Sequence, residues 1–581
     1  MIEPFVFIHV ALPALFGAAI ATCIFQSLNL NDLSILAIFL GTGSVLGNLL
    51  FALVAYVLSA LGLNLFDGSL LLLMDSLAFA STAVLMCVTL RRRKPSSLRR
   101  PEISTALVSL PLALLLLAQL FVILGRPMTG WDSIDFWLPT ASQLINPDEI
   151  TANSGETLRH RHPLTAAFIA ARDGTVASAS EHYAGMLLSW WVCLVSMAVI
   201  ASGTVAHFSK SGRIGLLAGY ATMSAPLLEN HGLIAGYAEL WIAALLVSSC
   251  AFFMLYFRWR SIVFLAIGVG ISSIAIFLKN TGVMYSCALV FAFIFISTVT
   301  KPLKRFKYIA LTSFAFVIGV AYTYEALRSN SFTTFELIDN VLIYNGGSLE
   351  ATTLAEDSFM IRFYPVDTEA LPKKRKRRGY DYRIIDRNEK IKTSESVENL
   401  KVNLPKFDVK YVRIGKYSSQ SKVLWIQTLS PNSKMTSYLG GLFIRHWGDH
   451  KLIEFAGWVV DIESVNSLRQ VLKNEIVSLL FNSSFSVFFI GLLFINISMF
   501  RSAYAHNAGN QQAVLFASTA SLTILVVLMA SQIFSSYVFE HSIPGNDQGN
   551  SRFSLPWLAL TIISLGASLG LSNRDWHPSS H

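Results

Sequence analysis

The chain has 581 residues, of which 53% are hydrophobic and only 14% are charged. About a quarter of the residues of a soluble domain are charged, so this composition excludes a soluble fold of this size and indicates a membrane protein. The formal net charge of +9 gains meaning only when the basic residues are assigned to one side of the membrane.

Thirteen apolar stretches are predicted to be membrane-spanning helices from their length and composition. The sixth stretch is short, and the eighth and ninth are almost continuous, so the number thirteen is approximate. The predicted spans are 5–28, 34–62, 68–90, 104–125, 184–206, 214–228, 233–257, 261–278, 281–299, 308–325, 475–499, 512–535 and 553–572.

Lys and Arg in the short loops give the orientation, because basic residues resist translocation. The loop RRRKPSSLRR at 91–100 carries six of them and is predicted to be cytoplasmic. Alternation places the other basic segments on the same side: 209–213, 257–260, 301–307, 499–501 and the C-terminal tail. The segments assigned to the outer side are poor in basic residues: NLND near 30, LFDG near 66, ENHG at 229–232 and the 536–552 loop. This topology places the N-terminus outside.

Two long segments fall on the outer side of this topology. The first, 126–183, follows the fourth span, and the second separates the tenth span from the eleventh. Only the second has the composition of a soluble domain, and we expect a mixed α/β domain outside the cytoplasm. The predicted organisation is an N-terminal three-helix segment (1–103), a transmembrane module (104–330), the outer domain (331–474) and C-terminal helices (475–581).

Two features of the outer domain have both an ordinary and a functional interpretation. The run within 372–383 contains six consecutive basic residues, which suit a solvated loop or contact with anionic lipid or an acidic glycan. His446 and His450 in HWGDH are close enough in sequence to ligate a metal ion. Their spacing matches no standard zinc pattern, and ordinary surface histidines explain them.

Ionisable residues from four distant parts of the sequence gather on the predicted outer side. Such residues are costly in a bilayer and indicate function where they converge. GWDSIDFWLP at 130–139 opens the first outer loop with Asp132 and Asp135. The others are Glu229, His231 and Glu239 in ENHGLIAGYAEL, Lys279 in FLKNTG and Arg552 in DQGNSRFSLPW.

This set of acids and bases suits the transfer of a sugar from a lipid phosphate. A carboxylate can take the proton of an acceptor hydroxyl as that hydroxyl attacks the sugar. Lys and Arg can stabilise the charge that builds on a phosphate leaving group. A site at the outer rim of the membrane predicts a lipid-linked donor, since nucleotide sugars are cytoplasmic. Catalytic roles are predicted for Asp132, Asp135 and Glu239, and donor-phosphate binding for Lys279 and Arg552.

The same segments resemble those of the GT-C superfamily of integral membrane glycosyltransferases, which use polyprenyl-phosphate sugars. GWDSIDFWLP is similar to the first-outer-loop motif of the bacterial members, with Asp132 in the place of the catalytic aspartate. GYAEL, FLKNTG and SRFSLPWLAL resemble three further family segments and place Glu239, Lys279 and Arg552. Two features depart from the family pattern. Thr281 stands where an acid is common, and three extra helices precede the helix that leads into the catalytic loop.

The resemblance implies a GT-C-like fold and an inverting glycosyltransferase of a bacterial inner or plasma membrane, with its active site on the extracytoplasmic face. The implied partners are a polyprenyl-phosphate sugar donor, a glycan, glycolipid or protein acceptor, and the lipid bilayer; no nucleic acid is expected. A lipid-glycan flippase or solute transporter is the alternative. Transporters usually have internal repeats and polar groups near the membrane midplane, and neither feature is clear in this sequence.

Several of these residues also have simpler interpretations. Asp132 can cap a short helix, Glu239 suits the dipole at a helix start, and Lys279, which has no acidic neighbour in sequence, can extend to the membrane interface. The pair Asp132 and Asp135 can hold a divalent ion, but its spacing is not D-x-D, so we assign no metal ligand and no definite cofactor. Further candidates for substrate contact are Trp131, Trp137, His160, His162, Glu229 and His231.

Overall fold

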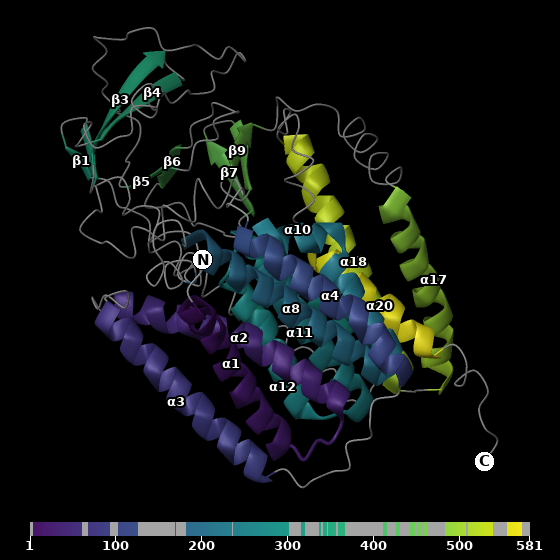
Figure 1. Ribbon diagram of the computed structural model, residues 1–581. Helices are drawn as coiled ribbons and strands as arrows, with labels where there is room; N and C mark the ends of the chain where they lie inside the picture. The colour runs from purple at the N-terminus through teal and green to yellow at the C-terminus, as the bar shows by residue number, and fades with distance from the viewer. Residues whose placement is uncertain are drawn as a thin grey trace.

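The computed structural model contains a bundle of apolar helices and a separate group of short strands (Figure 1). It describes residues 4–60, 68–92, 103–125, 169, 182–234, 236–300, 315–319, 483–506, 509–538 and 555–571, together with nine strands within 336–461. Six of the described helices are long and apolar enough to cross a membrane, as expected for an integral membrane protein. These six candidate spans are Phe7–Ser27, Leu33–Ala55, Gly185–Ser209, Ala238–Trp259, Thr281–Val299 and Gly509–Met529.

The N-terminal part of the bundle consists of α1 (Pro4–Ser27), α2 (Leu33–Ala60), α3 (Gly68–Arg92) and α4 (Ile103–Gly125). Glycines let α1 and α2 pack backbone against backbone. A Cβ atom added to Gly17 would lie 2.0 Å from the carbonyl oxygen of Gly43, and one added to Gly47 would lie 1.9 Å from that of Pro13. Small residues are what permit close contact between membrane helices, where the hydrophobic effect gives little attraction.

The central part of the bundle surrounds one helix. Its elements are α8 (His182–Ser209), α9 (Gly212–Ser224), α10 (Pro226–Ile234), α11 (Ala238–Trp259), α12 (Ile262–Ile276) and α13 (Asn280–Val299). All residues of α11 from Ala238 to Phe257 are buried inside the protein, and α11 contacts α2, α8, α12, α13, α18 and α20. An apolar helix that is buried on all sides forms the core of the bundle.

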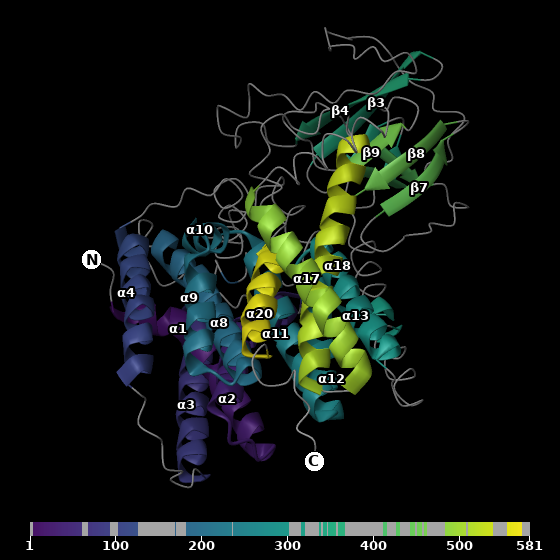
Figure 2. The same ribbon diagram turned by 90° about the vertical axis from the view of Figure 1, so that its right-hand side faces the viewer.

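The C-terminal helices pack onto this core although they are distant in sequence (Figure 2). They are α17 (Ser483–His506), α18 (Gly509–Val538) and α20 (Leu555–Leu571). α18 contacts α11 and α13, while α20 contacts α8 and α11. The segment that carries Lys279 and the helix that follows Arg552 in sequence are therefore parts of one packed unit.

The described residues of the predicted outer domain form strands. The helices that a mixed α/β domain would also contain remain a prediction. The strands are β1 (Glu336–Ile338), β2 (Val341–Tyr344), β3 (Gly347–Ala355), β4 (Ser358–Pro365), β5 (Tyr411–Ile414), β6 (Ile426–Leu429), β7 (Leu442–Trp447), β8 (His450–Phe455) and β9 (Trp458–Asp461). They form three antiparallel sheets, ordered β1-β2-β3-β4, β5-β6 and β7-β8-β9. In both views the strands lie beyond the end of the bundle that carries α10 (Figures 1 and 2).

The structure corrects the predicted bounds of one helix. The sixth predicted span, 214–228, is two helices, because the chain breaks between α9 and α10 at Ala225 and Pro226. Proline has no amide hydrogen and disfavours a helical conformation in the residue before it, and Ala225 accordingly is extended (φ −62°, ψ 118°). The segment ENHG, predicted as an outer turn, consequently lies inside α10.

The turn near residue 30 is also corrected, since it lies at the end of the bundle opposite to α10. Asp32 contacts His207 at the end of α8, with 2.6 Å between Oδ2 and Nδ1. The turn also shares a cavity with Trp259 and Ser261. The turn therefore lies on the same side as the basic segments 209–213 and 257–260, which are predicted to be cytoplasmic. If the N-terminus is outside, the first span must lead to this side. In so short a turn, the lack of basic residues did not show on which side of the membrane the turn lies.

Asp32 couples this turn to α8 and makes the fold sensitive to acid. The hydrogen bond from His207 lowers the pKa of Asp32 from 3.8 to about 2. A lowered pKa stabilises the folded state above the pKa of the unfolded chain, and this stabilisation is lost as the pH falls towards the folded value. The carboxylate is 41% exposed, so solvent screening limits the contribution to about 1 kcal/mol or less.

We therefore expect Asp32→Asn to be less stable than the wild type above about pH 4, with the difference disappearing near pH 2. Thermal unfolding of both proteins in detergent between pH 2 and pH 6 measures this. A stability difference that is constant over the whole range would contradict the assignment.

Candidate functional site

Two of the predicted site residues form an ion pair inside the protein. Lys279 Nζ donates a hydrogen bond to Glu239 Oε1 at 2.5 Å, although the two residues are 40 positions apart in sequence. The side chain of Glu239 is 1% exposed and that of Lys279 is 21% exposed. The pair joins the first turn of α11 to the start of α13, at the end of the bundle that carries α10. Lys279 thus has an acidic neighbour in space that the sequence did not reveal.

Local backbone features set the position of each partner. Gly236 has φ 83°, a conformation that favours glycine, and it lets the chain enter α11 so that Glu239 falls in the first turn. Lys279 is extended (φ −167°, ψ 157°) and immediately precedes α13. A Cβ atom on Gly282 would lie 2.0 Å from the carbonyl oxygen of Ala275, so α13 starts in direct contact with the end of α12. The segment FLKNTG is therefore a tight helix–helix junction that fixes the backbone of Lys279.

Glu239 lies close to two groups that complement a negative charge. The positive end of the α11 dipole and the Lys279 ammonium both stabilise a carboxylate in the first turn. Tyr285 on α13 is 2% exposed and lies within electrostatic range of Glu239. The arrangement holds one negative and one positive charge side by side at the end of the bundle core.

Gln119 on α4 is a second polar centre, which no sequence pattern predicted. Its Nε2 donates to Glu229 Oε1 at 3.0 Å and to the carbonyl oxygen of Met223 at 2.9 Å. Its Oε1 accepts a hydrogen bond from Trp191 Nε1 at 3.3 Å. Gln119 therefore links α4 to α8, α9 and α10. No motif marks a single amide in an apolar run, and only its polarity within the helix could have drawn attention to it.

The position of Gln119 connects it to the predicted catalytic loop. α4 ends at Gly125, and Asp132 follows seven residues later in sequence. Glu229, predicted as a substrate contact, is engaged by Gln119 and so has a structural role in the described part of the chain. We infer that Gln119 holds the helix that leads into this loop.

Aromatic residues anchor the connection between α10 and α11. His231 Nδ1 is 2.8 Å from the carbonyl oxygen of Leu227, and its ring centroid is 5.0 Å from that of Tyr237. Trp190 Nε1 donates to the carbonyl oxygen of Tyr237 at 3.0 Å, and its ring meets Trp241 edge to face at 5.8 Å. His231, a predicted substrate contact, is 9% exposed and takes part in this packing.

The described residues bring together four of the predicted site residues at one end of the bundle. Glu239 and Lys279 are in contact, and Glu229 and His231 lie on the adjoining helix α10. The remaining predicted residues lie outside the described residues: Asp132, Asp135, Trp131, Trp137, His160, His162 and Arg552. In the part of the chain that the structure describes, no group of three or more His, Cys, Asp or Glu side chains is placed to hold a metal ion.

Comparison with protein-family models, with curated proteins and with solved structures finds no match to this chain. The resemblance to the GT-C superfamily accordingly depends on four short sequence segments. The contact between Glu239 and Lys279 comes from the packing of α11 and α13.

Replacing Gln119 by Leu is expected to destabilise the protein by about 2–3 kcal/mol, because three hydrogen bonds are lost and their partners stay partly or fully buried. Unfolding of the detergent-solubilised variant by heat or denaturant measures this. Phe121→Leu is the matched control, since Phe121 lies on the same helix and is 81% exposed; we expect it to be neutral. Equal stability of Gln119→Leu and the wild type would show that these hydrogen bonds do not hold α4.

Proposed function

We propose that this protein is an integral membrane glycosyltransferase that transfers a sugar from a polyprenyl-phosphate donor to an extracytoplasmic acceptor, a glycan, glycolipid or protein, with inversion at the anomeric carbon. The observation that carries the proposal is the ion pair of Glu239 and Lys279. Two residues that were selected from separate segments of the sequence for one reaction lie in direct contact, at the end of the bundle towards which the strands extend.

Each residue has a defined part in the proposed reaction. Asp132 takes the proton of the acceptor hydroxyl, whose oxygen forms a bond to the anomeric carbon while the bond from that carbon to the phosphate oxygen breaks. The leaving polyprenyl phosphate carries the negative charge. Lys279 and Arg552 stabilise it, Lys279 as a point charge and Arg552 through two parallel hydrogen bonds.

Glu239 is best explained as the residue that positions Lys279. An ammonium group has three hydrogen-bond donors, so Lys279 can bond to Glu239 and to a phosphate oxygen at the same time. The carboxylate also offsets the charge of the ammonium group at the end of the bundle core. A preorganised cation of this kind costs little reorganisation when charge develops on the leaving group.

A lipid-glycan flippase or solute transporter is the second candidate, and one observation favours it. His9 on α1 forms a hydrogen-bonded pair with Asp75 on α3, between one and two turns inside the first end of each helix, and His9 is 2% exposed. Ionisable pairs within membrane helices often mark pathways for ions or substrates. The Glu239 and Lys279 pair at the bundle end favours the transferase, because a transporter site is usually near the midplane.

The two functions differ in whether the donor bond breaks. Purified protein in vesicles is given a panel of polyprenyl-phosphate sugars, and both release of polyprenyl phosphate and movement of the intact donor across the vesicle membrane are measured. We expect release that depends on an acceptor, loss of release in Lys279→Gln, and normal release in Lys210→Gln, whose Lys lies at the opposite end of the bundle. Movement of intact donor without release would replace the transferase by the flippase.

A further inference from the structure

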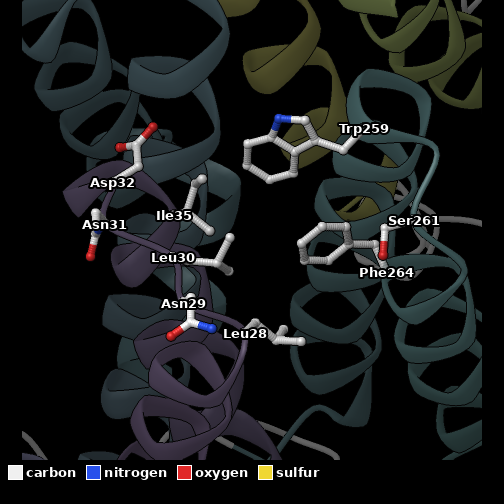
Figure 3. A pocket seen from close by; sticks show the side chains of 9 residues that line it. All are labelled: Leu28, Asn29, Leu30, Asn31, Asp32, Ile35, Trp259, Ser261 and Phe264. Atoms are coloured by element: carbon white, nitrogen blue, oxygen red, sulfur yellow. The ribbon is translucent and has the colours of Figure 1, made fainter. Parts of the chain in front are cut away.

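A second polar site lies at the end of the bundle opposite to Glu239. The cavity there is widely open to its surroundings and has a volume of about 810 Å³. It is lined by Leu28, Asn29, Leu30, Asn31, Asp32, Ile35, Trp259, Ser261 and Phe264. Figure 3 shows the residues of the α1–α2 turn on one side of the cavity and those of the α11–α12 connection on the other.

The helix ends around this cavity show how deep in the membrane it lies. α1 ends at Ser27, α2 begins at Leu33, α11 ends at Trp259 and α12 begins at Ile262. Four helix ends at one level are expected at the membrane surface, where phospholipid head groups lie. α11 has 22 residues, so this level is about 30 Å from that of Glu239.

Asp32 supplies the negative charge of the cavity. Its two oxygens accept hydrogen bonds from His207 and from the backbone amide of Ser34, at 2.6 Å and 2.8 Å. A carboxylate has about four acceptor positions, and the side chain is 41% exposed. It is therefore accessible to a further donor from a ligand. Asn29 and Asn31 add amide groups to the same side of the cavity.

Trp259 and Arg258 supply the complementary features on the opposite side. Trp259 is 38% exposed and presents an aromatic ring to the cavity, and such a ring attracts a cation. The Arg258 guanidinium is 5.7 Å from the centroid of that ring, within electrostatic range of Asp32, and held by Asn510 at 3.1 Å. Asp32 thus lines one side of a partly apolar cavity, and Arg258 lies beside Trp259, which lines the other side.

We propose that this cavity binds the phosphoethanolamine head group of a membrane phospholipid. The primary ammonium donates hydrogen bonds to Asp32 and lies against the ring of Trp259, while the phosphate lies towards Arg258. Leu28, Leu30 and Phe264 accommodate the start of the acyl chains. A purely anionic head group is disfavoured by Asp32, and a choline head group has no N–H donor for it. The site is independent of the transferase function.

Competition between lipids tests the site. Delipidated protein in detergent is titrated with phosphatidylethanolamine, phosphatidylcholine and phosphatidylglycerol that have identical acyl chains, and bound lipid is counted by native mass spectrometry. We expect phosphatidylethanolamine to bind about tenfold more tightly than the other two, as the loss of a charged hydrogen bond predicts. Asp32→Asn should remove the preference, and Trp259→Leu should weaken it.

The control variant is Asp75→Asn, which removes the acid of a second His–Asp pair among the described residues. His9, its partner, is 19 residues from Leu28 along α1, or about 28 Å, so the lipid preference should be unchanged. Soluble phosphoethanolamine is tested as a competitor. If it binds as tightly as the lipid, the ligand is a soluble compound and not a membrane phospholipid. Equal affinities for the three lipids, or a preference for phosphatidylglycerol, would overturn the site itself.

Discussion

Replacing Asp132 by Asn is expected to lower the turnover of lipid-linked sugar about 100- to 10,000-fold, while the donor still binds. Asn preserves the size of the side chain but cannot take a proton, so the acceptor hydroxyl must attack without a base. Release of polyprenyl phosphate measures turnover, and retention of the labelled donor on the purified variant measures binding. Loss of turnover with the donor retained is the result that a base at this position requires.

Asp135→Asn is the matched control, since the two acids are three positions apart in the same segment. We expect a smaller loss, because Asp132, and not Asp135, stands in the place of the catalytic aspartate in the segment that resembles the GT-C motif. If Asp132→Asn and the wild type have equal turnover, the base is another acid, and Asp135 is the next candidate. If neither protein turns over any donor, the transferase proposal is wrong. The vesicle assay then tests whether the protein moves the intact donor across the membrane.

Replacing Lys279 by Met is expected to lower the free energy of unfolding by about 3–5 kcal/mol, because it removes the cation that pairs with a buried carboxylate. Glu239 is 1% exposed and cannot regain water without a rearrangement of α11. Glu239→Gln should cost less, since Lys279 is 21% exposed and can be partly solvated. Unfolding of the two single variants and the double variant in detergent gives the coupling energy of the pair.

The double variant Glu239→Gln, Lys279→Met separates a structural role from a functional one. Removing both charges should recover much of the stability, because two well-packed neutral residues often match a buried ion pair. If the pair is only structural, turnover recovers together with stability. Our proposal requires that stability recovers and turnover does not, because the phosphate has lost its cation. Lys210→Met, at the other end of the bundle, is the control and should change neither quantity.

Several predicted helices are observed close to their expected bounds, because the signal for a membrane helix is local. A run of apolar residues long enough to cross the membrane identifies a helix whatever its neighbours are. The stretch 34–62 is observed as Leu33–Ala60, and 104–125 as Ile103–Gly125. The prediction failed where one residue interrupts a run, as Pro226 does, and where a turn had too few charges to give its side, as near residue 30.

The candidate site was predictable only in part. Its residue types and their positions at helix ends can be read from the sequence, and the segments GYAEL and FLKNTG pointed to Glu239 and Lys279. Gln119 was missed, because its importance comes entirely from the three groups that it meets on α8, α9 and α10. A single polar residue in an apolar helix gives no indication of the face on which its partners lie.

By itself, the sequence determined that this is a membrane protein of many helices, with acids and cations at the helix ends. The tertiary structure decided which ends meet: Glu239 with Lys279 at one surface, and Asp32 with His207 and Trp259 at the other. The reason is that hydrophobicity selects helices residue by residue, while their arrangement depends on close contacts between backbones, such as that of Gly282 with Ala275. Such contacts join residues that no sequence pattern connects.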